Sequence, residues 1–295
     1  MSVDVVSDGL YPGKLFVVEG IDGSGKTEYL SLLYRWCKQC NVPVKAVSFP
    51  RYETPTGERV KAYLAGEMGN PNPWKRAWLF AVDRLAAKDY LLTLRKMRYL
   101  VAINRYDISN YAFQGARFPS PAARKLFILA VRTLERGIFR IPKPDLVIFL
   151  DMPADLAFEL KKEQRTQEGG TPDIHERDFL YQQQVAAVYH ELYAKSQFDW
   201  LVIPCVHNDG LLGPAEIFAS AKDYARFSLP VLELGVLNLL SEAGDTGLSV
   251  RDLKSLFPEE ERSRIELVLL RLEGQKRVSS DRRRQRYYLR GGGGR

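Results

Sequence analysis

A phosphate-binding loop is the sequence feature that most narrows the folds open to this chain. Residues 19–27 read EGIDGSGKT and contain the full pattern Gly20-x-x-x-x-Gly25-Lys26-Thr27. The apolar run KLFVV precedes this stretch, and the helix-like segment YLSLLYRWCKQC follows it. The pattern requires this strand, loop and helix context, because the loop N–H groups and the helix N-terminus together surround phosphate oxygens. The sequence therefore predicts a nucleoside triphosphate site within an α/β fold.

Each residue type in this loop has an expected task. The small residues let successive backbone N–H groups turn toward the phosphates, and Lys26 reaches the β- and γ-phosphates. The Thr27 hydroxyl is the expected protein ligand of Mg²⁺. The predicted triphosphate-binding residues are Gly20, Gly23, Ser24, Gly25, Lys26 and Thr27.

Short apolar runs alternate with longer segments of helical period along the first 226 residues. The runs are rich in β-branched residues and lack strict alternation, as parallel strands covered on both faces do. We expect strands at 15–18, 44–49, 99–103, 145–150 and 200–204, and helices at 26–41, 56–65, 74–97, 119–137, 153–163, 177–196 and 214–226. This order predicts a doubly wound α/β domain with a parallel five-stranded sheet, which binds ligands at the carboxyl ends of its strands. We place this domain at 1–228 and a second, smaller one at 229–295.

Composition limits where the protein acts and what it contacts. Three cysteines are too few for a disulfide framework, the first 14 residues resemble no signal peptide, and no apolar stretch is long enough to span a membrane. We therefore expect a cytoplasmic protein without membrane contact. Residues 275–295 contain eight Lys or Arg and one Asp, so the net charge of +7 resides in the C-terminal end. Any contact with a polyanion is expected there.

Arginines and an aromatic residue are predicted near the same edge of the sheet as the loop. Arg105 directly follows the third strand and Arg51 follows the second. Phe80 and Arg84 are one helical turn apart, so they share a face and could stack on a base and hydrogen-bond its edge. Arginines near a triphosphate site favour a second substrate that carries phosphate over a water molecule as the phosphoryl acceptor.

Five motifs in order resemble the thymidylate kinase family. They are EGIDGSGKT, FPRYETPTG, LFAVDR, NRYDISNYAFQGA and PKPDLVIFLD, within residues 14–226. The resemblance implies transfer of the γ-phosphoryl group of ATP to dTMP, giving dTDP, with Mg²⁺ and in a homodimer. It further implies that Asp22 contacts the sugar 3′-hydroxyl, Phe80 stacks on thymine and Arg84 binds a thymine carbonyl. Arg105 would bind the acceptor phosphate, with Ser109, Phe113 and Gln114 lining the base and sugar pocket.

The expected mechanism is positioning and charge neutralisation, because both reacting phosphates are negative. Lys26 and Arg105 are predicted catalytic residues, together with an arginine from a polar lid at 161–178. Arg165 is the candidate lid residue, with Lys161, Lys162 and Arg177 as alternatives. A solvated loop without a catalytic residue is the other interpretation of this segment.

Two departures from the family pattern affect the substrate site. Asn104 stands where most thymidylate kinases have Asp, and it cannot contribute negative charge toward Mg²⁺. The phosphate-binding arginine of FPRY falls either at Arg51 or at the position of Tyr52, depending on the family branch. Two other functions remain open: a nucleotide-sensing regulator that binds DNA, and a kinase of another deoxynucleotide or deoxynucleoside.

The C-terminal segment has the pattern of a winged helix. Helix-like segments at 231–244, 249–257 and 259–274 precede a basic hairpin formed by 276–280 and 286–289. In a winged helix the third helix enters the major groove and the hairpin follows the phosphates. The candidate nucleic-acid-binding residues are Arg277, Arg282, Arg283, Arg284 and Arg286. The run of three glutamates at 259–261 would oppose DNA, so protein binding and a purely structural role stay open.

Overall fold

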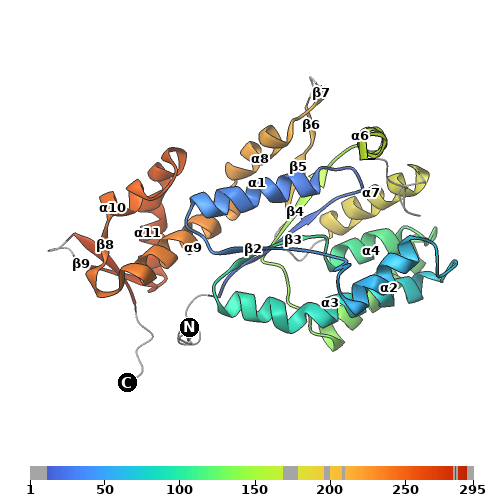
Figure 1. The fold of residues 1–295 in the computed structure, drawn as a ribbon, viewed down its shortest axis with the longest axis horizontal. Coiled ribbons are helices and arrows are strands. Elements are labelled where there is room, and N and C mark those ends of the chain that lie inside the picture. Colours follow the sequence, from blue (N-terminus) through green and yellow to red (C-terminus); the bar gives the residue numbers. More distant parts are fainter. Residues whose placement is uncertain are drawn as a thin grey trace.

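The central sheet has five parallel strands in the order β2-β3-β1-β4-β5 (Figure 1). The structure, a computed structural model, describes residues 12–168, 179–195, 200–207, 210–281, 283 and 285–290, without the side chains of 164–168. The strands are β1 (Leu15–Glu19), β2 (Val44–Ser48), β3 (Leu100–Asn104), β4 (Leu146–Asp151) and β5 (Trp200–Pro204). Each lies within one residue of its predicted ends, which confirms the predicted doubly wound α/β fold.

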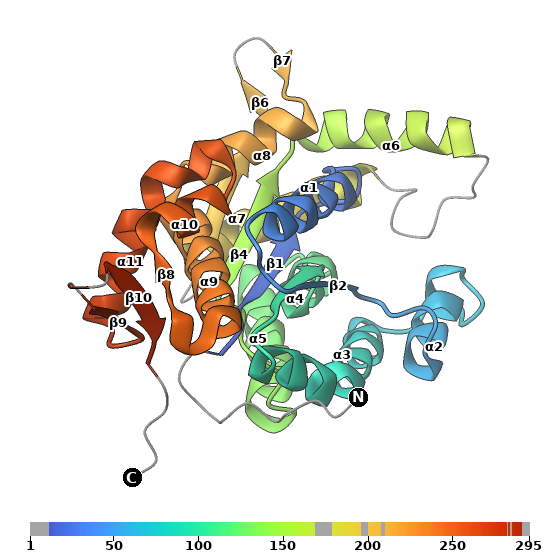
Figure 2. The same ribbon diagram turned by 60° about the vertical axis from the view of Figure 1, so that its left-hand side comes forward.

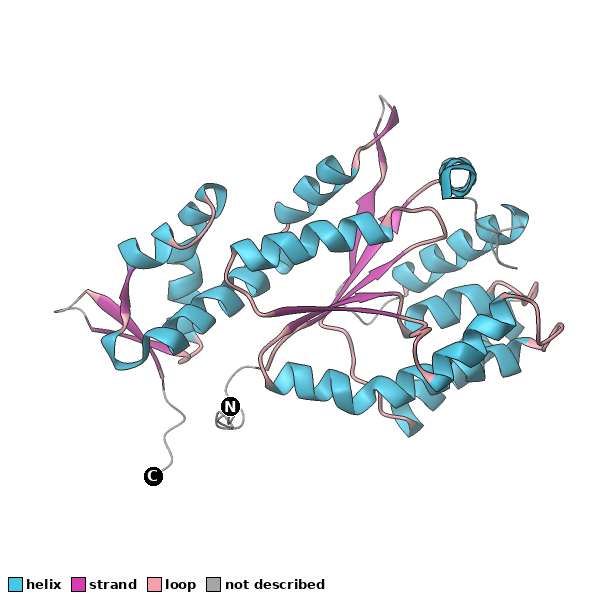
Figure 3. Ribbon diagram, viewed as in Figure 1, coloured by secondary structure: helices cyan, strands magenta, loops and turns pink. Residues whose placement is uncertain are grey.

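Helices cover both faces of this sheet (Figure 3). They are α1 (Lys26–Gln39), α2 (Pro55–Leu64), α3 (Pro73–Lys96), α4 (Asp107–Gly115), α5 (Pro121–Arg132), the π-helix η1 (Thr133–Ile138), α6 (Ala154–Glu168), α7 (Phe179–Ala194) and α8 (Pro214–Lys222). Side-chain oxygens of Thr54, Asn72 and Ser120 cap α2, α3 and α5, each followed by Pro at the first helical position. A short hairpin, β6 (Val206–His207) and β7 (Gly210–Leu211), follows β5.

Alternate residues of β1 supply the cores on the two faces of the sheet. Leu15 and Val17 pack in a cluster with Ala87 of α3, whereas Phe16 belongs to a larger cluster that includes α1 and the C-terminal helices. The sheet is therefore apolar on both faces, as its parallel strands require.

One helix was not predicted. The segment that carries Ser109, Phe113 and Gln114 forms α4, and eight of its nine residues are buried. The segment is only nine residues long and contains Asp107, Ser109, Asn110 and Gly115, which are residue types that favour turns, so sequence analysis did not identify it as a helix.

The C-terminal unit joins helices to a three-stranded antiparallel sheet of order β8-β10-β9 (Figure 2). Its elements are α9 (Ala225–Ala243), η2 (Gly244–Thr246), β8 (Leu248–Ser249), α10 (Val250–Ser255), η3 (Glu259–Arg264), α11 (Ile265–Gly274), β9 (Val278–Asp281) and β10 (Arg286–Leu289). The helix expected over 259–274 begins instead with the 3₁₀ turn η3, so only its second part is α-helical.

Helix α9 joins this unit rigidly to the sheet domain, because it runs without a break through the expected boundary at residue 228. Phe227, near its start, stacks on Trp36 of α1 with ring centroids 5.4 Å apart. The indole Nε1–H of Trp36 donates to the buried carboxylate of Glu261 at 3.2 Å, and Lys222 lies 3.6 Å from Glu260. The acidic start of η3 thus docks on the sheet domain. Among the described residues, no helix is long and apolar enough to cross a membrane.

Candidate active site

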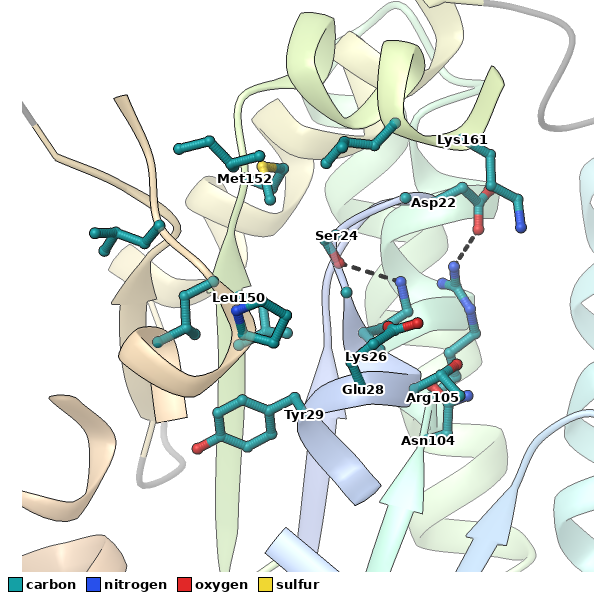
Figure 4. A pocket seen from close by; sticks show the side chains of 18 residues that line it. Asp22, Ser24, Lys26, Glu28, Tyr29, Asn104, Arg105, Leu150, Met152 and Lys161 are labelled. Carbon is teal, nitrogen blue, oxygen red and sulfur yellow. Dashed lines mark hydrogen bonds and ion pairs between the residues drawn. The ribbon is translucent and has the colours of Figure 1, made fainter. Parts of the chain in front are cut away.

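The phosphate-binding loop lies between β1 and α1 and opens into a cavity of about 640 Å³ (Figure 4). Residues 22–27 line it, together with the N-terminal part of α1 and residues of α6 and the β6–β7 hairpin. Gly23 has φ +84°, and a Cβ there would lie 2.1 Å from the Ala157 carbonyl oxygen of α6. A side chain at this position would therefore push the loop away from α6. Gly20 does not line the cavity, but its carbonyl accepts a hydrogen bond from Arg105 at 3.3 Å.

Lys26 folds back onto the loop. Its ammonium group donates to the Ile21 carbonyl at 2.5 Å and to the Ser24 hydroxyl at 3.2 Å. Burial, followed by the nearby Arg105 cation, lowers the pKa of Lys26 from 10.5 to about 7. Among the described residues, this buried ammonium group donates to oxygens of the loop. Phosphate oxygens would favour its charged form, so it is placed to bind an anionic ligand.

A second cavity, of about 390 Å³, adjoins the first on the α3 and α4 side. Both cavities are lined by Asp22, Asn104 and Arg105, so these three residues stand where the two meet. The predicted substrate-binding residues that line the second cavity are Asp22, Phe80, Arg84, Asn104, Arg105, Ser109, Phe113 and Gln114. One site can therefore hold two ligands side by side, one at the phosphate loop and one between α3 and α4.

Arg105 and Asp22 form an ion pair at this junction (Figure 4). Arg105 has φ +59°, a left-handed conformation that is uncommon outside glycine and frequent at functional sites. Gln182 of α7 donates to the second oxygen of Asp22 at 2.8 Å, and its own carbonyl oxygen accepts from the Asp22 N–H at 3.3 Å. Sequence analysis missed Gln182, because it follows the segment interpreted as a lid and belongs to none of the motifs.

The thymidylate kinase family model matches residues 18–208. The chain belongs to the thymidylate kinase family. It is 33% identical over 198 residues to the thymidylate kinase of Mycobacterium tuberculosis H37Rv, covering 64% of this chain and 90% of that protein. It is 30% identical over 215 residues to the thymidylate kinase of Pelotomaculum thermopropionicum, covering 70% of this chain and 94% of the relative. The structure of thymidylate kinase from Candida albicans shares the fold with a TM-score of 0.58 at 19% identity, covering 75% of this chain and 94% of that one.

Membership in the thymidylate kinase family favours an enzyme over a nucleotide-sensing regulator, and it gives the two cavities distinct tasks. The cavity at the phosphate loop is lined by residues 22–27, which include Gly25, Lys26 and Thr27 of the motif that is typical of nucleoside triphosphate sites. The cavity between α3 and α4 contains Phe80, Arg84 and Arg105, the residues that the resemblance assigns to the acceptor. The arrangement of the residues thus agrees with the family motifs.

Arg84 is held at the inner end of the acceptor cavity by a buried ion pair. It is 2% exposed, and its Nε and Nη2 donate to the two carboxylate oxygens of Glu135 at 2.6 and 2.9 Å. Burial lowers the pKa of Arg84, but the adjacent carboxylate outweighs this effect and raises it above the ordinary value. Arg84 therefore keeps its charge while buried. Glu135 belongs to none of the sequence motifs, and sequence analysis did not identify it.

Arg51 does not line either cavity of this thymidylate kinase family member. Its Nε lies 3.4 Å from the buried carboxylate of Asp83, and its backbone N–H donates to the same carboxylate at 2.9 Å. The neighbouring Tyr52 lines the acceptor cavity instead. Of the two positions that the sequence left open for the phosphate-binding arginine, the position of Tyr52 lines the cavity and Arg51 does not.

The expected lid lies only partly within the described residues. Lys161 of α6 lines the triphosphate cavity, on the same side as the Asp22–Arg105 pair (Figure 4). Arg165 lies in α6, but its side chain falls outside the described part, as does all of Arg177. Among the predicted lid cations, Lys161 is thus the one that the structure places at the site.

Glu19, the first residue of the EGIDGSGKT stretch, connects three of the elements around the site through hydrogen bonds. Its buried carboxylate accepts from the N–H groups of Tyr106 and Ser109 at 2.8 and 3.2 Å, and from the hydroxyls of Ser109 and Tyr189 at 2.6 and 2.8 Å. Four donors satisfy this carboxylate. It thereby ties β1 to α7 and to α4, which lines the acceptor cavity. Its place at the strand end, within the motif, was the signal that could have revealed it.

Proposed function

We propose that this member of the thymidylate kinase family transfers the γ-phosphoryl group of ATP to dTMP, giving dTDP and ADP. The observation that carries the proposal is the junction of the two cavities at Asp22, Asn104 and Arg105. A triphosphate on the loop and a monophosphate between α3 and α4 would direct their phosphates at each other there. Such an arrangement supports direct transfer, because positioning the acceptor oxygen supplies much of the rate enhancement.

The residues at the junction supply countercharge for two phosphates. Lys26 would bind the β- and γ-phosphates, and Arg105 would exchange Asp22 for the acceptor phosphate, as the family resemblance implies. Asp22 would then accept from the sugar 3′-hydroxyl, while Gln182 keeps its carboxylate in place. Lys161 is the proposed cation that approaches from α6 during transfer. Fixed positive charge near the transferring group lowers the barrier without a covalent intermediate.

The donor set at the junction fits Mg²⁺ held mainly by nucleotide phosphates. Thr27 and Asn104 line the triphosphate cavity, and Asn104 Oδ1 is buried without a hydrogen-bond partner among the described residues. Within that part of the chain, no cluster of three His, Cys, Asp or Glu side chains could hold a metal by itself. Mg²⁺ at phosphate-transfer sites takes one or two protein ligands together with phosphates and water. Thr27 is the proposed ligand, and the ion would neutralise charge on the transferring phosphate.

A coupled assay of ATP consumption tests this proposal. We expect turnover with dTMP and much slower turnover with dUMP, dCMP and deoxynucleosides. Faster turnover with any of those acceptors than with dTMP would identify a different kinase. The absence of turnover with all of them would contradict a kinase of this class.

Binding of MgATP is expected to take up about half a proton at pH 7, since free Lys26 has a pKa of about 7 and phosphates would raise it. The charged ammonium binds phosphate, so affinity should fall as the pH rises through the pKa of the free protein, by about tenfold between pH 6 and pH 8. Calorimetric titration in buffers with different ionisation enthalpies measures the uptake. The Lys26→Met variant should show no such uptake, and equal uptake in both proteins would assign the proton to another group.

Replacing Asn104 with Asp is expected to raise kcat about fivefold, roughly 1 kcal/mol of barrier. The new carboxylate would attract Mg²⁺ and favour the charged form of Lys26, which Asn104 cannot do. Initial rates at saturating ATP and dTMP measure the effect, with thermal unfolding as a check on folding. A tenfold fall in kcat would show that the amide is adapted to its site.

A second proposed function is nucleic-acid binding by the C-terminal unit. Two of the three glutamates that would repel DNA contact the sheet domain, because Glu261 accepts from Trp36 and Glu260 pairs with Lys222. The β9–β10 hairpin is left as the basic end of the unit, with Arg283 exposed. Arg286 instead donates to the carbonyls of the η2 loop at 2.9 and 3.0 Å. Arg277 is half-buried, and Arg282 and Arg284 lie outside the described residues.

The mode of this binding follows from the surface of α11. Leu267 and Leu270 are 51% and 64% exposed there, and neither side chain can read a base edge by hydrogen bonding. We therefore propose contact with the phosphate backbone rather than base reading by α11. Fluorescence anisotropy with duplexes of unrelated sequence should give similar affinities that weaken strongly with salt, and Arg283→Ala should weaken them further. Binding restricted to one sequence, or unaffected by salt, would contradict this mode.

A homodimer is also proposed for this family member. Exposed apolar side chains lie on α3, α5 and η1: Trp74, Trp78, Leu126, Leu129 and Ile138. Apolar exposure of this extent is typical of a surface that a partner covers. Analytical ultracentrifugation should give the mass of two chains, and a monomer at micromolar concentration would contradict the proposal.

A further inference from the structure

Glu135 is a buried carboxylate that contacts Arg84 and Asn110 of the acceptor cavity without lining it, and none of the motifs includes it. It lies in the π-helical segment η1 and is fully buried. Single π-helical turns are frequent at functional sites, where they redirect a side chain. Here the turn directs a carboxylate toward two residues that line the acceptor cavity, Arg84 and Asn110.

The two carboxylate oxygens of Glu135 accept hydrogen bonds from these two neighbours. Oε2 accepts from Arg84 Nε at 2.6 Å, while Oε1 accepts from Arg84 Nη2 at 2.9 Å and from Asn110 Nδ2 at 2.8 Å. Asn110 Nδ2 also donates to the backbone carbonyl of Ala77 at 3.0 Å. Both partners of this nitrogen are acceptors, so only one orientation of the Asn110 amide satisfies them.

Arg84 and Asn110 each have one polar group that is not used in the hydrogen bonds to Glu135 and Ala77. Asn110 Oδ1 is buried and has no partner in the described part of the chain. The Nη1 amine of Arg84 likewise has no hydrogen bond to the described residues. A buried acceptor without a partner marks a place where a ligand or water completes the network. This pair of residues therefore offers the cavity one donor, on Arg84, and one acceptor, on Asn110.

We propose that Glu135 is a positioning residue for substrate specificity: by holding Arg84 and Asn110, it makes the cavity accept a 4-oxo pyrimidine nucleotide and reject a 4-amino one. The inference rests on the proposed dTMP kinase function and names the group that sets its base preference.

The chemistry of the bases supports this assignment. Thymine and uracil present a carbonyl oxygen at C4 beside an N–H at N3, which are complementary to a donor and an acceptor placed side by side. Cytosine presents an amino group at C4 beside a bare nitrogen at N3, so both contacts would be reversed. Leaving buried polar groups of a site unpaired costs a substrate analogue a large factor in kcat/KM, so we expect dTMP to exceed dCMP by at least about 100-fold.

The test is the ratio of kcat/KM for dTMP to that for dCMP, measured in the wild type and in Glu135→Gln. A glutamine amide replaces one of the two carboxylate oxygens with an N–H, which faces either Arg84 Nε or both Arg84 Nη2 and Asn110 Nδ2. In either orientation at least one of the two side chains loses its acceptor and is no longer held toward the base. We expect the ratio to fall at least tenfold. A role in stability alone would lower both values together and leave the ratio unchanged, which would overturn the proposal.

Asp107→Asn is the matched control. Asp107 is an equally buried carboxylate on α4, but it accepts from Arg136 at 2.6 Å and from Tyr111 at 2.7 Å and does not line the cavity. This variant should keep the wild-type ratio. A similar drop in the ratio in both variants would overturn the proposal, since it would show that the preference for dTMP depends on the overall rigidity of the fold and not on Glu135.

A measurement on the wild type decides the question if Glu135→Gln does not fold. N3-methyl-dTMP lacks the N–H that Asn110 Oδ1 would accept, and dCMP reverses both contacts. Both should inhibit dTMP phosphorylation at least about 100-fold less tightly than dTMP binds. Tight inhibition by dCMP would overturn the inference while leaving the dTMP kinase function intact. Loss of all dTMP turnover in the wild type would instead contradict the proposed function itself.

Discussion

Lys26→Met is expected to lower kcat by about 1,000-fold or more, roughly 4 kcal/mol of barrier, without loss of folding stability. The turnover falls because the ammonium group is the cation that the phosphate loop itself supplies to the transferring phosphate. Stability should stay equal or rise. In the folded chain the pKa of Lys26 is about 7, whereas in the unfolded chain it has its ordinary value of 10.5. Lys26 therefore binds its proton more tightly in the unfolded chain, and at pH 7 this difference disfavours folding.

Steady-state rates and thermal unfolding at pH 7, measured on the same samples, check both parts of this prediction. Lys45→Met is the control, because Lys45 is exposed on β2 and lines neither cavity. Its kcat should stay within a factor of about two. A Lys26→Met variant that is both inactive and much less stable would show that the side chain supports the loop rather than the reaction.

Gly235→Ala is expected to destabilise the protein by about 2–4 kcal/mol. Gly235 lies in the interior of α9, where a Cβ would stand 2.1 Å from the Cys40 carbonyl oxygen and 3.0 Å from the Phe257 ring. Backbone cannot give way as a flexible side chain can, so α9 would have to move off α1. The gain in helix propensity from Gly to Ala, about 1 kcal/mol, is smaller than this cost.

Urea denaturation at equilibrium measures the change in the free energy of unfolding. Gly274→Ala is the control, since Gly274 is also helical and a Cβ there would meet nothing within 4 Å. It should be neutral or stabilising by up to about 1 kcal/mol. Equal effects of the two substitutions would mean that α9 and α1 are not in the close contact described.

The parts of the fold that sequence predicted are those with a local signal. Strands β1 to β5 were predicted within one residue, because buried parallel strands are apolar runs bounded by polar turns. The phosphate loop was predicted because its glycines and Lys26 have fixed spacing beside a strand and a helix. Where a helix is short and rich in residues that favour turns, as in α4, the local signal is weak and the helix was missed.

The remaining differences come from contacts that no local pattern records. Arg51 stands in a family motif, yet the distant Asp83 carboxylate decides where its side chain points. Glu135 approaches Arg84 across 51 positions of sequence. The predicted boundary at 228 lies just before Pro230, but Pro230 is inside α9 and the helix continues through both positions. Such long-range pairing is a property of the folded chain, and a single sequence contains no direct sign of it.

The unbroken α9 also has a thermodynamic consequence. Because one helix contributes to the cores on both sides of residue 228, we expect the two halves to unfold in a single thermal transition rather than in two. A molecule bound to the C-terminal end would then protect the phosphate-transfer site against heat, and nucleotide would protect the C-terminal end in return.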